Sequence, residues 1–438
     1  MRRTIGIALT AAILALAMVA PTSAFAASTL VVDDDGFGTA ANCNAATPAY
    51  ATIQSAVNAA AAGDTVKVCP GTYAESVTVS TWGLKLVGAH VGLNAKGCPS
   101  RSGTSMVMGG AGGAFNFAAD GVVIDGFLIS GGSAYGIETS ELFSGYLIRN
   151  NVIELNAGGI YLNASGSIHT RVKRNCFREN NNTFYDVTPF PTAGTGIYTD
   201  QGLQNANIYG NGFRGHLNLG INLATTLDGT GMVSVTDTGN VRVAANVSKN
   251  DRVFLAIYNA HHIYVSGNTV RQNASGQDWN GSAIYVGGGS DIGGEGARAI
   301  TVTNNSIRSK NVPNGFYAGI AVRGSAERIV VTFNTINGTY NGISISSDAS
   351  DAAFVHRNAI WNAHNNGIEA LVTDPYVGGG PATQNYFSVN TAHGSANFDC
   401  YDDTSGDSTL GTANTWRRFG PSRNIGDTSS PTGLCATN

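Results

Sequence analysis

An asparagine recurs at one fixed phase of an apolar pattern along most of the chain, and this repeat limits the fold more than any other feature. The pattern is apolar-x-x-Asn-x-apolar, as in Val331, Asn334 and Ile336. Eight asparagines hold this position, and the copy at Asn246 is degenerate: Asn151, Asn175, Asn211, Asn246, Asn268, Asn305, Asn334 and Asn358. Successive copies lie 22 to 37 residues apart. A constant minimum spacing between copies, with a variable number of additional residues, is typical of one structural unit repeated with insertions in its loops.

A second motif, Gly-Ile-x-apolar or a near variant, follows each asparagine, as in Gly342-Ile343. Each unit therefore contains three short stretches of alternating apolar residues, too short for helices. Three short strands per turn, stacked on similar turns, predict an all-β fold, the right-handed parallel β-helix. The asparagine would sit at a bend and bond to the asparagine of the next coil, ~4.8 Å away. A propeller or a sandwich is the alternative, but neither would place an asparagine at one phase of every repeat.

The two ends of the chain differ from the repeats. Residues 1–26 have a basic start, an apolar run and the small-x-small sequence Ala24-Phe25-Ala26, which together are typical of a secretory signal peptide. We expect one domain: the β-helix with its N-terminal cap over residues 27–382, and a loop-rich C-terminal capping tail of the same domain over residues 383–438. An amphipathic helix within residues 50–64 would cover the first strands.

Charge restricts the partners of the exported chain. Without Arg2 and Arg3, 23 basic residues stand against 29 acidic ones, a net charge of −6. An acidic chain lacks the electrostatic footprint of a nucleic-acid binder. No later segment is expected to span a membrane. The sequence predicts a secreted protein, extracellular or periplasmic, and a monomer.

Six cysteines in an exported protein predict disulfides. Cys43 and Cys69 both belong to the N-terminal segment, and Cys400 and Cys435 both belong to the C-terminal segment. We predict these two bridges. The pairing of Cys98 and Cys176 stays open at this stage.

The segment YATIQSAVNAAAAGDTVKVCPGTYAESVTV, residues 50–79, resembles the opening coils of the pectin-lyase-like right-handed β-helix superfamily. The downstream copies resemble the generic parallel β-helix repeat. The tail from Asp399 to Cys435 is similar to the ends of secreted bacterial proteins with such repeats, which supports the Cys400–Cys435 bridge. The resemblance covers nearly all of the mature chain and implies the fold.

The resemblance implies no single activity, because the superfamily includes polysaccharide lyases, polygalacturonases, pectinesterases, uronan epimerases, tailspikes and adhesins. The paired Asp and His-Gly motifs that polygalacturonases carry in the middle of the β-helix are absent from the middle of this repeat region. Pectinesterases share the element seen here as Gly71, Tyr73 and Glu75, but their catalytic Asp motifs have no match. The Asp-Pro-His-Asp motif of uronan epimerases is also missing. The resemblance is therefore to scaffold elements.

The Gly-Ile-x-apolar strand resembles the strand that floors the substrate groove in polysaccharide-active members. Its outward position is x, and one residue per coil occupies it: Glu138, Tyr161, Tyr198, Asn222, Ala256, Tyr285, Ala321, Ser344 and Glu369. Three of them, Tyr161, Tyr198 and Tyr285, suit the apolar faces of sugar rings, and we predict them to bind substrate. Tyrosine is also a common strand residue on an exposed face, which is the alternative explanation.

Long insertions flank this strand between residues 175 and 325, and function is usually placed in such loops. Trp279 is a further candidate for substrate binding there. Asp186, Asp200 and Asp278 are the candidate carboxylates for acid–base or nucleophilic chemistry on a glycoside. Arg323 is the candidate cation for a lyase, because it could neutralise a uronate before β-elimination. Further candidates in this region are Asp228, His216, His261, His262 and Arg298.

Two functional hypotheses follow. The first is an enzyme, a lyase or a glycoside hydrolase, that binds and cleaves an extracellular polysaccharide. The second is a non-catalytic β-helix that binds glycans or serves at the cell surface. The sequence requires no cofactor, and calcium is the candidate for the lyase.

Overall fold

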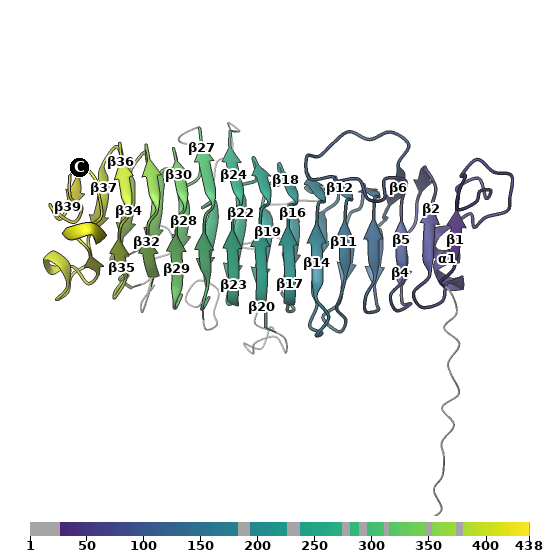
Figure 1. Cartoon of the computed structure of the whole chain (residues 1–438), viewed down its shortest axis with the longest axis horizontal. Coiled ribbons are helices and arrows are strands. Elements are labelled where there is room, and N and C mark those ends of the chain that lie inside the picture. The colour runs from purple at the N-terminus through teal and green to yellow at the C-terminus, as the bar shows by residue number, and fades with distance from the viewer. Residues whose placement is uncertain are drawn as a thin grey trace, which may run out of the picture.

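The computed structural model describes residues 27–182, 193–225, 237–273, 281–288, 296–310, 315–346, 353–373 and 380–437. Short strands wind into coils that stack along one axis, from the N-terminal strands to the C-terminal ones (Figure 1). Equivalent strands of successive coils pair in parallel and form three sheets of 14, 13 and 12 strands. The predicted right-handed parallel β-helix is therefore confirmed. The signal peptide predicted over residues 1–26 lies outside the described residues.

The first two sheets hold the longer strands. The 14-stranded sheet consists, in order, of β1 (Thr29–Val32), β2 (Thr65–Val68), β5 (Lys85–Val87), β8 (Val123–Asp125), β11 (Leu147–Arg149), β14 (Thr170–Lys173), β17 (Gln204–Tyr209), β20 (Gly239–Ala244), β23 (His261–Ser266), β26 (Thr301–Thr303), β29 (Ile329–Thr332), β32 (Ala353–His356), β35 (Tyr386–Ser388) and β38 (Thr415–Trp416). The 13-stranded sheet consists of β4 (Val77–Val79), β7 (Phe115–Phe117), β10 (Tyr135–Thr139), β13 (Gly158–Tyr161), β16 (Thr195–Thr199), β19 (Leu219–Ala224), β22 (Val253–Tyr258), β25 (Ile284–Gly287), β28 (Ala318–Val322), β31 (Asn341–Ile345), β34 (Asn366–Ala370), β37 (Phe398–Asp402) and β39 (Ser429–Ser430).

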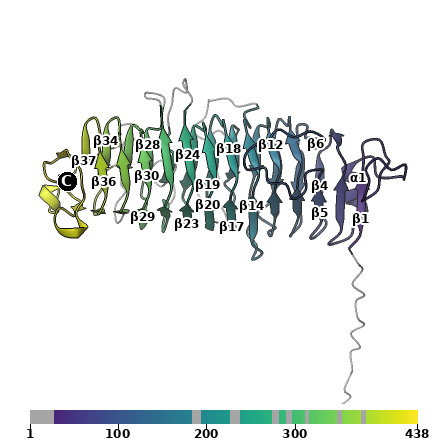
Figure 2. The same ribbon diagram turned by 45° about the horizontal axis from the view of Figure 1, so that its top comes forward.

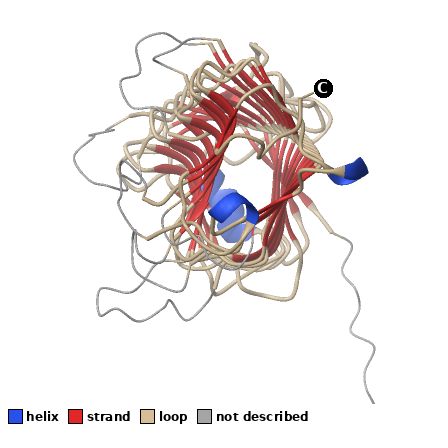
Figure 3. Ribbon diagram, turned by 90° about the vertical axis from the view of Figure 1, so that its left-hand side faces the viewer, coloured by secondary structure: helices blue, strands red, loops and turns tan. Residues whose placement is uncertain are grey.

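The third sheet closes the coil between the other two. It consists of β3 (Gly71–Tyr73), β6 (Ser105–Met108), β9 (Leu128–Ser130), β12 (Val152–Glu154), β15 (Cys176–Arg178), β18 (Gly212–Arg214), β21 (Val247–Lys249), β24 (Thr269–Gln272), β27 (Ser306–Ser309), β30 (Thr335–Asn337), β33 (Ala359–Trp361) and β36 (Thr391–His393). Seen along the axis, the three sheets form the walls of one tube (Figure 3). Alternate residues of each strand point into it: Ile329 and Val331 of β29 belong to the core, whereas Val330 between them does not.

The recurrent asparagines form the predicted ladder at the bend after the 14-stranded sheet. The side-chain amide of each asparagine donates to the side-chain oxygen of the next at 2.9 to 3.1 Å, from Asn151 to Asn358. The ladder continues through Asn390 to Asn424. These side chains are almost completely buried. Each rung satisfies polar groups that would otherwise be buried without a partner, which explains the fixed phase of the repeat.

A short helix lies at the N-terminal end. α1 spans Ile53–Ala59, which is shorter than the segment marked by the sequence, and buries Ile53, Ala56 and Val57. The Glu75 side chain accepts hydrogen bonds from the backbone N–H groups of Ile53 and Gln54 at 2.8 and 3.0 Å. α1 packs against β1, β2 and β4. Its role as a cap stays a prediction.

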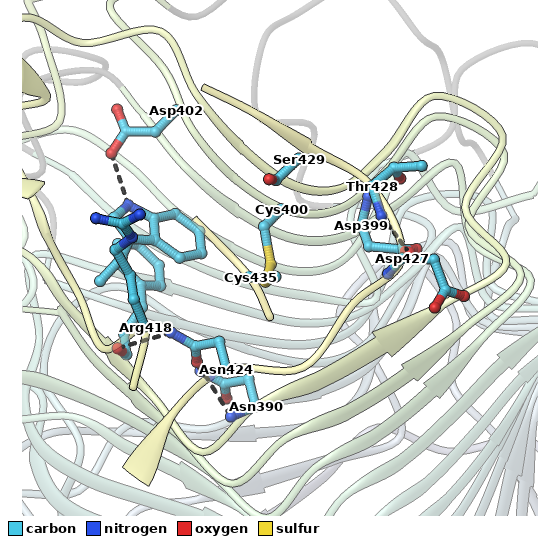
Figure 4. The surroundings of a disulfide bond; sticks show 12 residues. Asn390, Asp399, Cys400, Asp402, Arg418, Asn424, Asp427, Thr428, Ser429 and Cys435 are labelled. Atoms are coloured by element: carbon cyan, nitrogen blue, oxygen red, sulfur yellow. Dashed lines mark hydrogen bonds between the residues drawn. A yellow bond between two sulfur atoms is a disulfide. The ribbon is translucent and has the colours of Figure 1, made fainter. Parts of the chain in front are cut away.

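The sheets continue into the C-terminal segment, where strands alternate with longer connections and two short 3-10 helices, η1 (Thr409–Gly411) and η2 (Gly420–Ser422). Figure 4 shows the last rung of the ladder, Asn390 to Asn424, beside the Cys400–Cys435 disulfide. Asp402 is buried there and accepts from the Trp416 indole at 2.8 Å.

Both predicted disulfides are present, Cys43–Cys69 and Cys400–Cys435, and the remaining cysteines form a third, Cys98–Cys176. The third disulfide ties the connection between β5 and β6 to β15. The same connection is held by two long-range bonds, Ala95 N–H to the Arg174 carbonyl and the Lys96 amine to the Ala245 carbonyl. Within the described residues no helix is long and apolar enough to cross a membrane.

Candidate functional site

One column of outward side chains runs along the 13-stranded sheet, and its register is the one predicted from the sequence. Strand pairing aligns all nine expected residues, from Glu138 to Glu369. The alignment includes Ala256, whose coil has a degenerate motif. The column extends to Asn116 on one side and Tyr401 on the other. The residues just before it, such as Ile160, belong to the core, so the column faces away from it.

Three tyrosines stack on this face. The ring centroids of Tyr135 and Tyr161 are 5.4 Å apart, and those of Tyr161 and Tyr198 are 6.1 Å apart. Gly158 makes the stack possible, because a Cβ at that position would overlap the Tyr135 ring. Tyr135 precedes the column by three residues, and the period-two pattern used to select outward residues did not mark it.

Asp200 lies at the centre of this tyrosine group. It directly follows β16, and its carboxylate accepts a hydrogen bond of 2.6 Å from the Tyr161 hydroxyl. Tyr198 also hydrogen-bonds to it. Burial raises the pKa of the Asp200 carboxyl above its ordinary value, although both tyrosine hydroxyls act in the opposite direction. Burial also raises the pKa of the Tyr161 and Tyr198 hydroxyls, which keeps them protonated as donors.

Glu138 is a second carboxylate with a perturbed pKa on the same face. It is half-buried, and this burial raises its pKa. Strand pairing sets Glu138 directly beside Tyr161, the residue that donates to Asp200. Two carboxyl groups of raised pKa therefore flank one tyrosine, and perturbed groups of this kind cluster at functional sites.

A second aromatic group lies further along the same face, around Arg323. The Tyr258 and Tyr285 rings are 5.0 Å apart. The guanidinium carbon of Arg323 lies 5.9 Å from the Tyr285 ring centroid and 5.3 Å from that of Tyr317. The Arg323 residue is only 8% exposed. Its guanidinium is therefore enclosed by tyrosines at the edge of the column rather than extended into solvent.

Asp200 and Arg323 belong to separate parts of this face. Asp200 follows β16 and Arg323 follows β28, with β19, β22 and β25 between these strands. Four strand spacings correspond to roughly 19 Å between their backbones. Asp200 and Arg323, the two predicted catalytic residues that the structure describes, therefore do not converge on one bond, and they mark two regions of one extended face.

The remaining sequence candidates fall elsewhere. Asp186, Asp228, Asp278 and Trp279 lie outside the described residues. His216 is fully buried and bonds to Asp251 at 2.7 Å, in a second, shorter ladder that starts with Asn156 and Asn180. It is a structural residue.

His261 and His262 belong to the 14-stranded sheet, and Arg298 bridges to His261 there. These residues therefore lie on another wall of the tube than the tyrosine column.

At two places among the described residues, a group of three potential metal-binding side chains lies close together. One contains Cys43 and Cys69, which are bonded to each other. The other is His393, Asp399 and Asp427. Figure 4 shows Asp399 and Asp427 beside the C-terminal disulfide. The Asp399 carboxylate already accepts from the backbone N–H groups of Ser395 and Asp427 at 3.1 and 2.8 Å. This carboxylate therefore holds a turn, and neither group matches the oxygen-rich shell that calcium prefers.

No protein-family model matches this chain, and a search of curated proteins also gave no match. Solved structures do show similarity. The catalytic unit of a thermostable GH87 α-1,3-glucanase from Streptomyces thermodiastaticus strain HF3-3 has a TM-score of 0.58 at 17% identity, over 86% of this chain and 66% of that one. A GH87 α-1,3-glucanase catalytic domain in complex with tetrasaccharides has a TM-score of 0.54 at 15% identity, over 82% of this chain and 64% of that one. An alginate lyase from Paenibacillus sp. str. FPU-7 has a TM-score of 0.47 at 14% identity, over 77% of this chain and 96% of that one.

The chain therefore has the parallel β-helix fold that its repeats predict, with the coils stacked along one axis (Figure 2). It spans slightly less than two thirds of the length of the two glucanase structures. At these identities the similarity concerns the fold.

Proposed function

We propose that this protein binds a polysaccharide along the outward face of the 13-stranded sheet and hydrolyses it with Asp200 as the general acid. One observation carries the proposal. The Asp200 carboxyl has a raised pKa and is held by the Tyr161 and Tyr198 hydroxyls among stacked tyrosines. A carboxyl of raised pKa retains a proton that it can donate to a leaving oxygen.

The tyrosine column supports a glycan as the substrate. Sugar rings present apolar C–H faces that pack on aromatic rings, while their hydroxyls bond to polar groups beside them. Tyr135, Tyr161, Tyr198 and Tyr285 supply such rings along the coil axis, which is the direction of a bound linear chain. The fold shared with two glucanases is compatible with this role.

The charges on the face favour a neutral glycan over a uronate polymer. Glu138, the carboxylate proposed to be ionised, lies at the first tyrosine group, where it would repel an anionic chain. The described part of the face holds Arg323 as its cation, and tyrosine rings enclose it. We therefore rank hydrolysis above β-elimination, and we assign Glu138 as the second carboxylate, which activates the attacking water.

The alternative is a non-catalytic glycan-binding protein or an adhesive surface protein. It would retain the tyrosine stack but would not need the ionisation of Asp200. The three disulfides support an exported protein in either case, because such bridges persist in oxidising compartments.

The test uses the purified mature chain with neutral α- and β-glucans, pectate and alginate, with and without calcium. New reducing ends and unsaturated-uronate absorbance are followed together. We expect reducing ends without absorbance on a neutral glucan, and we expect Asp200→Asn to abolish them. Calcium-dependent absorbance on a uronan would favour a lyase. Binding without cleavage would favour the alternative.

A further inference from the structure

We propose a second glycan-binding surface on the 14-stranded sheet, near its C-terminal end, which takes a carboxylate-bearing polysaccharide. This surface, the aromatic–arginine strip, consists of Phe333, Phe354, His356, Arg357, Tyr386 and Arg417. It belongs to β32, β35 and the residues that follow β29, β32 and β38. The groove column lies on the 13-stranded sheet, so the strip is a separate site.

The aromatic part of the strip is a run of packed rings on the outward face. Phe354 and Tyr386 stack across neighbouring strands, with centroids 5.5 Å apart and planes 14° apart. His356 stacks on Phe354 at 5.2 Å, and Phe333 meets His356 edge-on at 6.4 Å. Phe354 is 39% exposed and Phe333 is 48% exposed. Solvent-exposed aromatic residues in such a continuous group mark interaction sites more often than single exposed residues do.

Two exposed guanidinium groups flank these rings. The Arg417 Nε donates to the Tyr386 hydroxyl at 2.6 Å, and its guanidinium carbon lies 5.6 Å from the Tyr386 ring centroid. The guanidinium carbon of Arg357 lies 5.5 Å from the Phe333 ring centroid. Contacts with the rings reduce the motion of both side chains, so less conformational entropy is lost when they bind a ligand.

The described strands of the strip carry no negative charge that would neutralise these cations. β29, β32, β35 and β38 contain no Asp or Glu. Among the residues that the structure describes, no carboxylate forms an ion pair with Arg357 or Arg417. Guanidinium groups bind carboxylates with two parallel hydrogen bonds, so a carboxylate on the ligand is the complementary group.

The occupant must also contact the rings. A uronate residue offers both an apolar ring face and a carboxylate, which matches aromatic edges beside a guanidinium. The strip extends over four coils, whose three strand spacings amount to roughly 14 Å, the length of two or three sugar residues. Identification of the ligand as a polysaccharide rests on the proposed function. The inference that the ligand carries a carboxylate rests on the charge of the strip alone.

The test measures binding of the full mature protein to polygalacturonate by isothermal titration and affinity electrophoresis, with dextran as the neutral polymer and dextran sulfate as a second polyanion. Phe354→Ala and the double variant Arg357→Gln/Arg417→Gln are compared with Arg171→Gln. Arg171 is an exposed outward arginine of the same sheet, in β14, and serves as the matched control.

We expect polygalacturonate to bind, the affinity to fall about tenfold in the double variant and about three- to tenfold in Phe354→Ala, and Arg171→Gln to bind as the wild type does. Dextran should not bind to the strip. The proposal is overturned if the wild type does not bind polygalacturonate or if the double variant binds it unchanged. If Phe354→Ala binds both dextran sulfate and polygalacturonate as the wild type does, the aromatic rings do not contribute to binding. The strip would then be a general cationic patch, and recognition of a sugar would be overturned.

Hydrolysis in the groove is measured in the same preparations. If the groove cleaves no polymer but the strip binds, the strip proposal stands and the proposed hydrolase fails. If the groove cleaves a glucan and the strip variants bind polygalacturonate as the wild type does, the proposed hydrolase stands and the strip proposal fails.

Discussion

A tyrosine followed two residues later by an aspartate occurs twice at the same register of the 13-stranded sheet, and the two pairs differ in their surroundings. Tyr198 and Asp200 belong to the coil of β16, whereas Tyr401 and Asp403 belong to that of β37. Asp200 accepts a hydrogen bond of 2.6 Å from Tyr161 of the neighbouring coil. Asp403 is exposed, with Tyr401 at 3.4 Å.

The comparison shows that the short motif does not determine the chemistry of the carboxyl. Stacked rings from three coils surround Asp200, and its burial raises its pKa. Asp403 instead accepts from the Val372 N–H at 2.6 Å and faces solvent. Neighbouring coils therefore complete the site, whereas the strand that precedes the aspartate supplies its position and the Tyr198 hydroxyl.

The largest difference is expected in catalysis. Asp200→Asn should lower kcat about 10²- to 10⁴-fold, because an amide cannot donate the proton that a general acid supplies. Asp403→Asn should leave kcat unchanged, since this carboxyl lies in the open. Steady-state reducing-end assays on the two variants check the comparison. Equal losses in both would mean that the tyrosine surroundings of Asp200 have no catalytic role.

Truncation of the asparagine ladder should destabilise the protein more at a central rung than at the last described rung. Asn175 donates to the Ile148 carbonyl and to Asn211 at 2.9 and 3.1 Å, so Asn175→Ala leaves several buried groups unpaired. We expect a loss of about 3 kcal/mol in the free energy of unfolding. Asn424→Ala, at the last described rung beyond Asp403, should cost less because terminal repeats can open alone. Urea unfolding monitored by circular dichroism measures both, and an equal cost would contradict the account.

The stack over Tyr161 can be disturbed without changing Asp200. Gly158→Ala places a methyl group against the Tyr135 ring and should displace it. We expect KM to rise about three- to tenfold with a small change in kcat, because an aromatic contact to substrate is lost. Gly97→Ala is the control, since no atom lies within 4 Å of a Cβ at that position. An unchanged KM would remove Tyr135 from the binding surface.

The smallest effect is a shift of the pH profile. The Tyr161 hydroxyl donates to Asp200 and favours its ionised form, so Tyr161→Phe should raise the pKa of this carboxyl further. Activity that needs protonated Asp200 falls as pH rises through that pKa, and its alkaline limb should therefore move to higher pH. Tyr401→Phe should leave the limb in place. A shift to lower pH in Tyr161→Phe would contradict the assigned hydrogen bond.

The fold could be predicted because the ladder and the core impose fixed residue types at fixed phases. The asparagine phase and the Gly-Ile motif located every rung from Asn151 to Asn358 and the nine members of the outward column from Glu138 to Glu369. They did not mark its extensions at Asn116 and Tyr401. Asn390 was missed although Phe387 and Ala392 keep the pattern around it, whereas Pro421 and Gly426 break the pattern around Asn424.

The site was harder to predict, because it depends on which side chains of different coils meet. Tyr135 and Tyr258 join it through ring contacts whose partners are 26 to 63 residues away in sequence. Tyr317 joins it through the Arg323 guanidinium, six residues away. The separation of Asp200 from Arg323 depends on the number of strands between them, which loops of unequal length obscure. Cys98–Cys176 depends on a connection that runs along the axis, and local patterns carry no signal for it.

The central claim is that the outward face of the 13-stranded sheet is the glycan-binding surface. The most direct test is a crystal structure of the Asp200→Asn variant with an oligosaccharide of the best-bound neutral glucan. We predict sugar rings along Tyr135, Tyr161 and Tyr198, with a glycosidic oxygen within hydrogen-bond distance of the residue 200 side chain. Sugar bound on another sheet, with the tyrosine stack free, would contradict the account.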